Sequence, residues 1–430
     1  MLGGFLGRID QLGRSFRALL LSDTLSILAI MVGHVATAWW IARQGGGGDL
    51  ALYAGAIAVG AMIWLPLLSP IGDRYRKQTI MTWSLGGQTL VAAALAALAQ
   101  VGTYHLPLII LIDLVGAATS ALFAPASINI AAELLPAEQL TNGLGLQKSG
   151  QALGRLIGPA LGGGILALAG TATTLWLYAL LLGLATILAS RIPRLQGART
   201  ATATTGWLDD IRAGLAAKWH IRVERWWTFI TLLFAIFLFP CLGMLMPLKI
   251  LSLHLSSTWL GLCEAALSAG LLVGALGLST GLAQRLGRFA AYTSCVVGMG
   301  LCFITIGAVH QPLVLLATLV VCGLCVATTQ LVGQTHRMLA IPQAFRARMT
   351  SVQIMVMQVA ATIGPALGGI AFDRLGVDRV YILFGGAILL TGAGYVLAPG
   401  YRAFISLSHE RVEGYYARTY PALFEPRQSD

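Results

Sequence analysis

Twelve continuous apolar stretches of about 20 residues run through this 430-residue chain. That length lets an α-helix cross the ~30 Å hydrocarbon core of a bilayer, whereas the strands of an outer-membrane barrel alternate apolar and polar residues. The stretches predict an all-α membrane protein with twelve transmembrane helices and little room for an extramembrane domain. They start near residues 18, 50, 78, 106, 142, 171, 227, 257, 286, 312, 348 and 378.

The composition excludes several other classes of protein. Only 10% of the residues are charged, against about 25% in a typical soluble domain. An ordinary soluble enzyme, a disordered chain and a secreted disulfide scaffold are therefore excluded. All six cysteines lie in predicted spans of the second half, where small packing residues are a better interpretation than a metal site.

The net charge of +11 reflects topology rather than nucleic-acid binding. With the N-terminus inside, 22 Lys and Arg side chains fall on inner segments and four on outer loops. Such a bias is the positive-inside signal of a multi-pass protein. It predicts a bacterial inner-membrane location with both termini in the cytoplasm.

An internal repeat divides the chain into two related halves. The string IGPALGG occurs at 157–163 and again at 363–369, and IGDRYRK (71–77) corresponds to LAQRLGR (282–288). Repeats at half-chain spacing are typical of transporters. We expect two pseudo-symmetric six-helix halves with a linker and a tail: residues 1–192, a cytoplasmic linker with an amphipathic helix at 193–226, residues 227–400, and a cytoplasmic tail at 401–430.

The loop SPIGDRYRKQ (69–78) places an acid before clustered cations. Asp73, Arg74 and Lys77 are candidate gate residues that join neighbouring helices at the inner face. The alternative is that the cations only fix topology.

Glycines recur every four residues in the predicted fifth helix, which lets another helix approach closely. A proline among them can bend the helix. The face is either a moving interface or a static packing seam. Its candidate hinge and interface residues, with their counterparts in the second half, are Gly145, Gly154, Gly158, Pro159, Gly162, Gly163, Gly364 and Pro365.

These motifs resemble the major facilitator superfamily of secondary transporters. The loop matches that family's G-x-x-x-D-R-x-G-R-R/K pattern at Asp73, Arg74 and Lys77, and departs from it at Ser69 and Arg76. Residues 145–163 match the antiporter signature G-x8-G-x3-G-P-x2-G-G at every fixed position. Residues 123–163 are similar to the branch that includes enterobactin-type siderophore exporters and macrolide efflux pumps. The resemblance implies the twelve-helix fold and export.

Ionisable groups inside spans are energetically expensive, so each is a functional candidate. An Arg that many family members carry in helix four is replaced here by Ile112, so no proton scheme that depends on it applies. Glu264 has no evident basic partner in the sequence, and a lone His is often only a packing residue. The candidates for proton coupling are Asp113, Glu264, Asp23 and His34.

A second group of polar side chains is suited to holding a substrate. Lys148 and Arg155 share one face of the fifth helix and can bind an anion. The alternative is that they neutralise Asp23 and Asp113, because buried charges are normally paired. The glutamine amides can hydrogen-bond either a substrate or a neighbouring helix. The full set of substrate-binding candidates is Lys148, Arg155, Gln330, Gln334 and Gln358.

No catalytic, metal or nucleotide motif is present in the sequence, so we expect no enzyme activity and no cofactor. The predicted function is proton-coupled export of a small amphiphilic or anionic molecule, first a siderophore or related metabolite. The alternatives are a multidrug or macrolide pump, a lysophospholipid flippase and a non-transporting sensor. The expected partners are a small-molecule substrate, protons and the lipid bilayer, without nucleic acid, around a monomeric protein.

Overall fold

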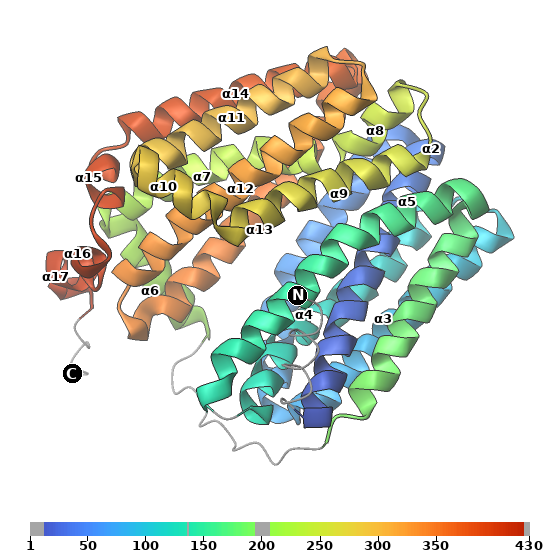
Figure 1. The fold of residues 1–430 in the computed structure, drawn as a ribbon, viewed down its shortest axis with the longest axis horizontal. Helices are drawn as coiled ribbons and strands as arrows, with labels where there is room; N and C mark the ends of the chain where they lie inside the picture. The colour runs from blue at the N-terminus through green and yellow to red at the C-terminus, as the bar shows by residue number, and fades with distance from the viewer. Residues whose placement is uncertain (1–12, 136, 194–206, 425–430) are drawn as a thin grey trace. The chain divides into compact units, whose positions relative to one another are not determined.

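The computed structural model describes residues 13–135, 137–193 and 207–424, and within these ranges the chain is almost entirely helical (Figure 1). The described part contains no strand. Its first half contains α2 (Gly13–Arg74), α3 (Lys77–Val101), α4 (Leu106–Leu134) and α5 (Ala137–Ser190). Then follow α6 (Trp207–His220), α7 (Arg222–Leu242), α8 (Leu245–Ser252), α9 (Ser257–Val273), the π-helical turn η1 (Gly274–Leu278), α10 (Ser279–Leu286), α11 (Arg288–Ala308), α12 (Pro312–Ala340), α13 (Gln343–Leu375) and α14 (Val377–Leu397).

Among the described residues, ten helical segments are long and apolar enough to cross a membrane. Two of them, Ser15–Trp64 and Asn142–Ser190, have 50 and 49 residues, which is more than twice the length that one crossing needs. Each is broken by a glycine in the left-handed region, Gly46 (φ 72°) and Gly170 (φ 80°). Glycine tolerates this conformation because it has no Cβ. The ten segments are therefore compatible with twelve crossings.

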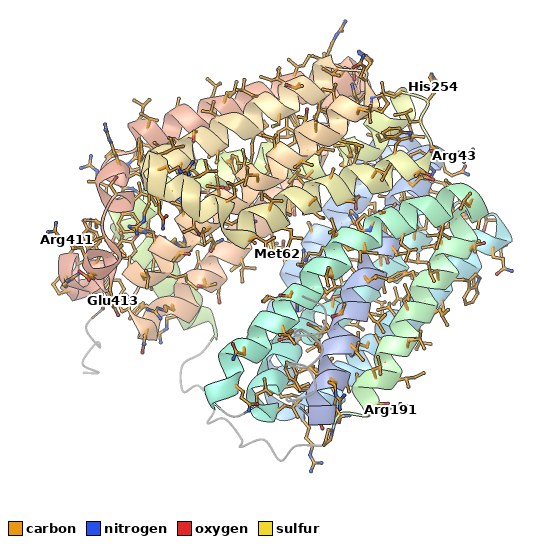
Figure 2. The ribbon with its side chains drawn as sticks, viewed as in Figure 1. Arg43, Met62, Arg191, His254, Arg411 and Glu413 are labelled. Carbon is orange, nitrogen blue, oxygen red and sulfur yellow. The ribbon has the colours of Figure 1, made fainter. Side chains whose placement is uncertain are left out.

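The chain separates into two compact units. The first contains residues up to Ala201 together with Met246–Ala265, and the second contains Thr202–Leu245 and Ala266–Asp430. In the first unit α2 packs against α4 and α5, and α3 packs against the same two helices. Its core is built from side chains such as Phe16, Met81 and Leu182. Arg43 and Arg191 lie at opposite ends of this unit (Figure 2).

In the second unit α11 packs against α12 and α14, while α7 packs against α13 and α14. The IGPALGG repeat has the same role in both units. A Cβ added at Gly158 would lie 2.9 Å from the Leu28 carbonyl oxygen of α2, and one at Gly364 would lie 2.5 Å from the Ile236 carbonyl oxygen of α7. Each copy of the repeat thus packs closely on an earlier helix, α2 in the first unit and α7 in the second.

The amphipathic segment of the linker forms α6. Its buried side is made by Gly214, Ala217 and Lys218, whereas Leu215 and Trp219 are more than half exposed. The apolar stripe that the sequence predicts is therefore turned away from the protein at these two positions. An exposed apolar stripe suits a helix that rests on a membrane surface.

The tail is folded rather than extended. It contains α15 (Tyr401–Ile405), α16 (His409–Val412), α17 (Tyr415–Thr419) and the 3₁₀ turn η2 (Pro421–Leu423). Phe404, Val412 and Tyr416 are buried in one cluster with Ile221 and Ile341, so the tail packs on residues near the ends of α6 and α12. The tail residues Arg411 and Glu413 lie at one end of the second unit (Figure 2).

Candidate functional site

Three of the four proton-coupling candidates lie together in the first unit. His34 on α2 and Glu264 on α9 form a pair in which Nδ1 and Oε1 are 3.6 Å apart. The exposed fraction is 52% for the His34 side chain and 15% for Glu264. The sequence offers no base for Glu264, and that expectation is wrong because folding brings α9 against α2. His34 also lies within electrostatic range of Asp113.

Asp113 on α4 has an uncharged partner. The Tyr53 hydroxyl donates a hydrogen bond of 2.6 Å to Oδ2 of Asp113. A second tyrosine, Tyr178 on α5, covers this region, because a Cβ at Gly33 would lie only 2.6 Å from its ring. We refer to His34, Tyr53, Asp113 and Glu264 as the acid–histidine cluster. Neither tyrosine could be singled out from the sequence, since tyrosine is an ordinary residue in a span.

Asp23, the fourth candidate, belongs to a different environment. It is 11 residues before His34 on α2, about 16 Å along a helix. Its carboxylate is buried and accepts hydrogen bonds from the side-chain amides of Gln147 (3.1 Å) and Gln151 (2.6 Å). Lys148 reaches the same group indirectly, since its Nζ donates to the Gln151 side-chain oxygen over 3.3 Å. Gln147 and Gln151 are therefore polar contacts that the sequence did not identify.

The substrate-binding candidates are mostly exposed in the structure. Lys148 and Arg155 are exposed on α5, while Gln330 and Gln334 are exposed on α12. Gln358 on α13 is half-buried. Within the described part of the chain, Lys148 donates a hydrogen bond to the Gln151 amide oxygen, and Asp113 accepts one from the Tyr53 hydroxyl. The exposed side chains of Lys148 and Arg155 are thus accessible to an anion.

The glycine face of α5 makes very close contacts with α2. Added Cβ atoms at Gly154 and Gly162 would each lie 3.0 Å from backbone atoms of α2, and Gly158 is as tightly packed. Gly145, by contrast, faces open space. Pro159 lies inside the helix, as does Pro365 in the corresponding part of α13.

Gly163 continues this close packing toward α9. A Cβ there would lie 2.8 Å from the Gly261 Cα, and the Ser257 hydroxyl donates a 3.3 Å hydrogen bond to the Gly163 carbonyl. Gly261 in turn lies directly against the Pro159 carbonyl. Because Glu264 is one helical turn from Gly261, the contact between Gly163 and Gly261 also determines the position of Glu264 along α2.

The gate candidates can be described only in part. Asp73 and Arg74 fall in the last turn of α2, and their side chains lie outside the described residues. Lys77 is the first residue of α3 and is half-buried.

A buried charged network in the second unit was not found from the sequence. The Glu224 carboxylate accepts hydrogen bonds from Arg337 Nε (2.8 Å) and from the Tyr416 hydroxyl (2.9 Å). It also forms an ion pair with Lys218, whose Nζ lies 3.2 Å away. Lys218 also donates to the Gln353 side-chain oxygen over 2.8 Å. Burial lowers the pKa of Lys218 to about 8, against the opposing attraction of Glu224. The network joins α6, α7, α12, α13 and the tail.

The described residues contain no group of three or more His, Cys, Asp or Glu side chains placed to hold a metal ion. What they do contain is a pair of carboxyl groups, an imidazole and a phenol inside segments long enough to span a bilayer. Such groups exchange protons and hydrogen-bond polar solutes at membrane depth.

Comparison with known proteins identifies the fold. A profile of the Major Facilitator Superfamily matches residues 19–310 and 282–407, which is most of the chain. The chain belongs to the major facilitator superfamily. The resemblance drawn from the loop and glycine motifs is confirmed, and with it the prediction of a multi-pass membrane transporter that is not an enzyme.

Named relatives cover most of the chain. The Multidrug efflux pump Tap of Mycobacterium tuberculosis is 27% identical over 384 residues, covering 86% of this chain and 90% of Tap. Macrolide efflux protein A of Streptococcus pyogenes is 24% identical over 348 residues, covering 75% and 80%.

Solved structures share the fold at lower identity. The nucleoside transporter NupG superposes with a TM-score of 0.69 at 12% identity, covering 91% of this chain and 99% of NupG. A bacterial homologue of the iron transporter ferroportin gives 0.69 at 16% identity, covering 92% and 99%. These similarities concern the fold alone.

Proposed function

We propose that this transporter is a proton-coupled exporter of small amphiphilic molecules, and that drugs are among its substrates. The observation that carries the proposal is the acid–histidine cluster, in which His34 pairs with Glu264 beside Asp113. Two relatives named as efflux pumps, for multiple drugs and for macrolides, support export of such molecules. The match to the antiporter signature at 145–163 supports exchange rather than uptake.

In this proposal the two halves alternate between inward-open and outward-open states. Residues 1–192 and 227–400 are the moving halves, and 193–226 and 401–430 are a cytoplasmic linker and tail. Asp113 and Glu264 release protons to the cytoplasm and take them up from outside as the substrate leaves. A gradient of about 150 mV provides about 3.5 kcal/mol per proton, enough for a few-hundred-fold gradient of a neutral solute.

The experiment is transport by the purified protein in liposomes under an imposed pH gradient. The parent is expected to move a fluorescent amphiphilic dye against its gradient. Asp113→Asn and Glu264→Gln each remove a carboxyl group and are expected to lower the initial rate by about 10-fold or more. Asp49→Asn is the matched control, because Asp49 also accepts a hydrogen bond from a tyrosine, Tyr104, at 2.7 Å.

Four outcomes contradict the proposal. A transport rate that does not depend on the pH gradient would show that transport is not coupled to protons. An equal loss of transport in Asp49→Asn would show that the acid–histidine cluster has no specific role. If no solute is transported in any condition, the result favours a non-transporting sensor. If only lipid analogues are transported, it favours a flippase.

A second substrate class is favoured by the exposed cations Lys148 and Arg155 on α5. These side chains suit an anionic metabolite such as a siderophore. Mass spectrometry of medium and cells, with and without iron, tests this class in a deletion strain. This class is supported if the deletion strain retains an anionic metabolite and still retains it when the strain expresses the Lys148→Gln or Arg155→Gln variant. If no metabolite changes, the anionic class is contradicted and drugs remain the proposed substrates.

A further inference from the structure

The second unit contains a cavity of about 700 Å³ that the proposed transport mechanism does not use. It lies where α10, α11 and α12 meet the tail helix α15. The polar side chains in its lining are Thr280, Gln284, Arg288, Thr335, His336, Arg402 and Ser406. No acidic residue lines it, so the cavity is electropositive.

Its two guanidinium groups are held by contacts to the protein. Arg288 donates to the Leu407 carbonyl, and the His336 ring nitrogen Nε2 lies 3.0 Å from the same oxygen. Arg402 lies over the Phe289 ring, with its Cζ 5.5 Å from the ring centroid. Among the described residues no acceptor bonds to the Arg402 guanidinium, so its donors remain available. An arginine stacked on an aromatic ring is oriented in advance to bind an oxyanion.

The backbone adds further donors. Arg288, Phe289 and Ala290 begin the 21-residue helix α11 and line the cavity. The first N–H groups of a helix have no intrahelical acceptor. The residues that carry these donors therefore line the same cavity as the two guanidinium groups. Together with the hydroxyls of Thr335 and Ser406, they suit an anion with several oxygen atoms.

The lining also contains large apolar side chains, namely Leu286, Phe289, Leu331 and Val332. A free inorganic ion would leave most of the 700 Å³ unfilled and these side chains without a contact. The ligand must therefore combine an oxyanion with an apolar body.

We propose that this cavity binds a phosphoryl group carried on an apolar or glyceryl body, with Arg288 and Arg402 as its main contacts. The headgroup of an anionic phospholipid and a soluble organic phosphate share this chemistry. Because Arg402 belongs to the tail and Arg288 to α11, the bound ligand would tether the tail to the end of α11.

The test is native mass spectrometry of the full-length protein in detergent. The probes are phosphatidylglycerol, the phosphate-free lipid dioleoylglycerol, and glycerol 3-phosphate. We expect phosphatidylglycerol to bind and dioleoylglycerol not to bind. Arg402→Gln is expected to weaken binding by about 10-fold or more, the size of a lost hydrogen bond to a charged group. Thr335→Val keeps the charge and is expected to weaken binding by about 2-fold to 5-fold.

Arg285→Gln is the matched control. Arg285 is exposed on α10 next to the cavity but does not line it. Equal weakening by Arg285→Gln and Arg402→Gln would mean general surface attraction and would overturn the site, as would equal binding of dioleoylglycerol. Glycerol 3-phosphate that binds as well as the lipid indicates a soluble ligand. Binding of phosphatidylglycerol alone indicates a lipid.

Discussion

At the scale of single residues, each of the three carboxyl groups that are candidates for proton coupling has a polar contact. Asp113 has Tyr53, Glu264 has His34, and Asp23 has two glutamine amides. Charges at membrane depth are costly, which is why the sequence alone identified these positions. It did not identify their contacts. His34 and Glu264 are 230 residues apart, and only the packing of α9 on α2 brings them together.

The pairing of His34 with Glu264 predicts that the two side chains act as one unit in transport. His34→Gln and Glu264→Gln are each expected to lower the transport rate, and the double variant is expected to be no worse than the worse single variant. Residues in contact show coupling on the order of 1–2 kcal/mol, about 5-fold to 30-fold in rate. The measurement is the initial rate of dye uptake into inverted vesicles, which is the export direction in that orientation, for the parent and three variants.

Glu264→Gln combined with Asp49→Asn serves as the control cycle. Asp49 has its own partner in Tyr104, so the losses in this cycle should multiply. If the losses of His34→Gln and Glu264→Gln also multiply, the contact in the first unit has no role in transport.

At the scale of helices, four-residue spacing of glycine was enough to predict a close-packed face on α5. The identity of what packs there was not predictable, because a glycine pattern specifies a short distance and not a partner. In the structure Gly154, Gly158 and Gly162 face α2, whereas Gly163 faces Gly261 of α9. Gly145 matches the family signature yet faces open space, so sequence pattern and packing do not coincide at every position.

Neighbouring glycines on α5 provide a direct test of this packing. Gly163→Val is expected to abolish or strongly reduce transport, because a Cβ there would meet Gly261 Cα at 2.8 Å and overpacking costs about 1–3 kcal/mol. Gly164→Val is expected to be tolerated, because nothing lies within 4 Å of a Cβ at Gly164. Dye export is measured together with the amount of protein in the membrane. Equal activity of the two variants would show that α5 and α9 are not packed as described.

At the scale of the whole molecule, the fold was the most predictable feature. Span length and the positive-inside bias follow from the thickness and polarity of the bilayer, the IGPALGG repeat indicates two related halves, and the family match agrees with the predicted fold. The tail was not predictable. Its polar sequence carries no periodic signal, and its docking depends on Phe404, Val412 and Tyr416 finding an apolar surface made by residues far away in the chain.

The tail also completes the charged network around Glu224, and this predicts a stability effect. Burial raises the pKa of Tyr416 well above its usual value, so its hydroxyl stays protonated and donates to Glu224. Tyr416→Phe removes that donor and leaves a buried carboxylate oxygen with one hydrogen bond fewer. The expected cost is about 1–3 kcal/mol, seen as a lower melting temperature of the detergent-solubilised protein.

Tyr415→Phe is the control for this prediction. Tyr415 is the adjacent residue, is only half-buried, and packs by its ring against Phe404, a contact that phenylalanine retains. Its melting temperature should stay within about 1 °C of the parent, since a substitution that keeps the ring and removes no buried bond costs little. A Tyr416→Phe protein as stable as the Tyr415→Phe protein would mean that Arg337 and Lys218 alone satisfy Glu224. The tail would then stabilise the second unit by apolar packing and not through the charged network.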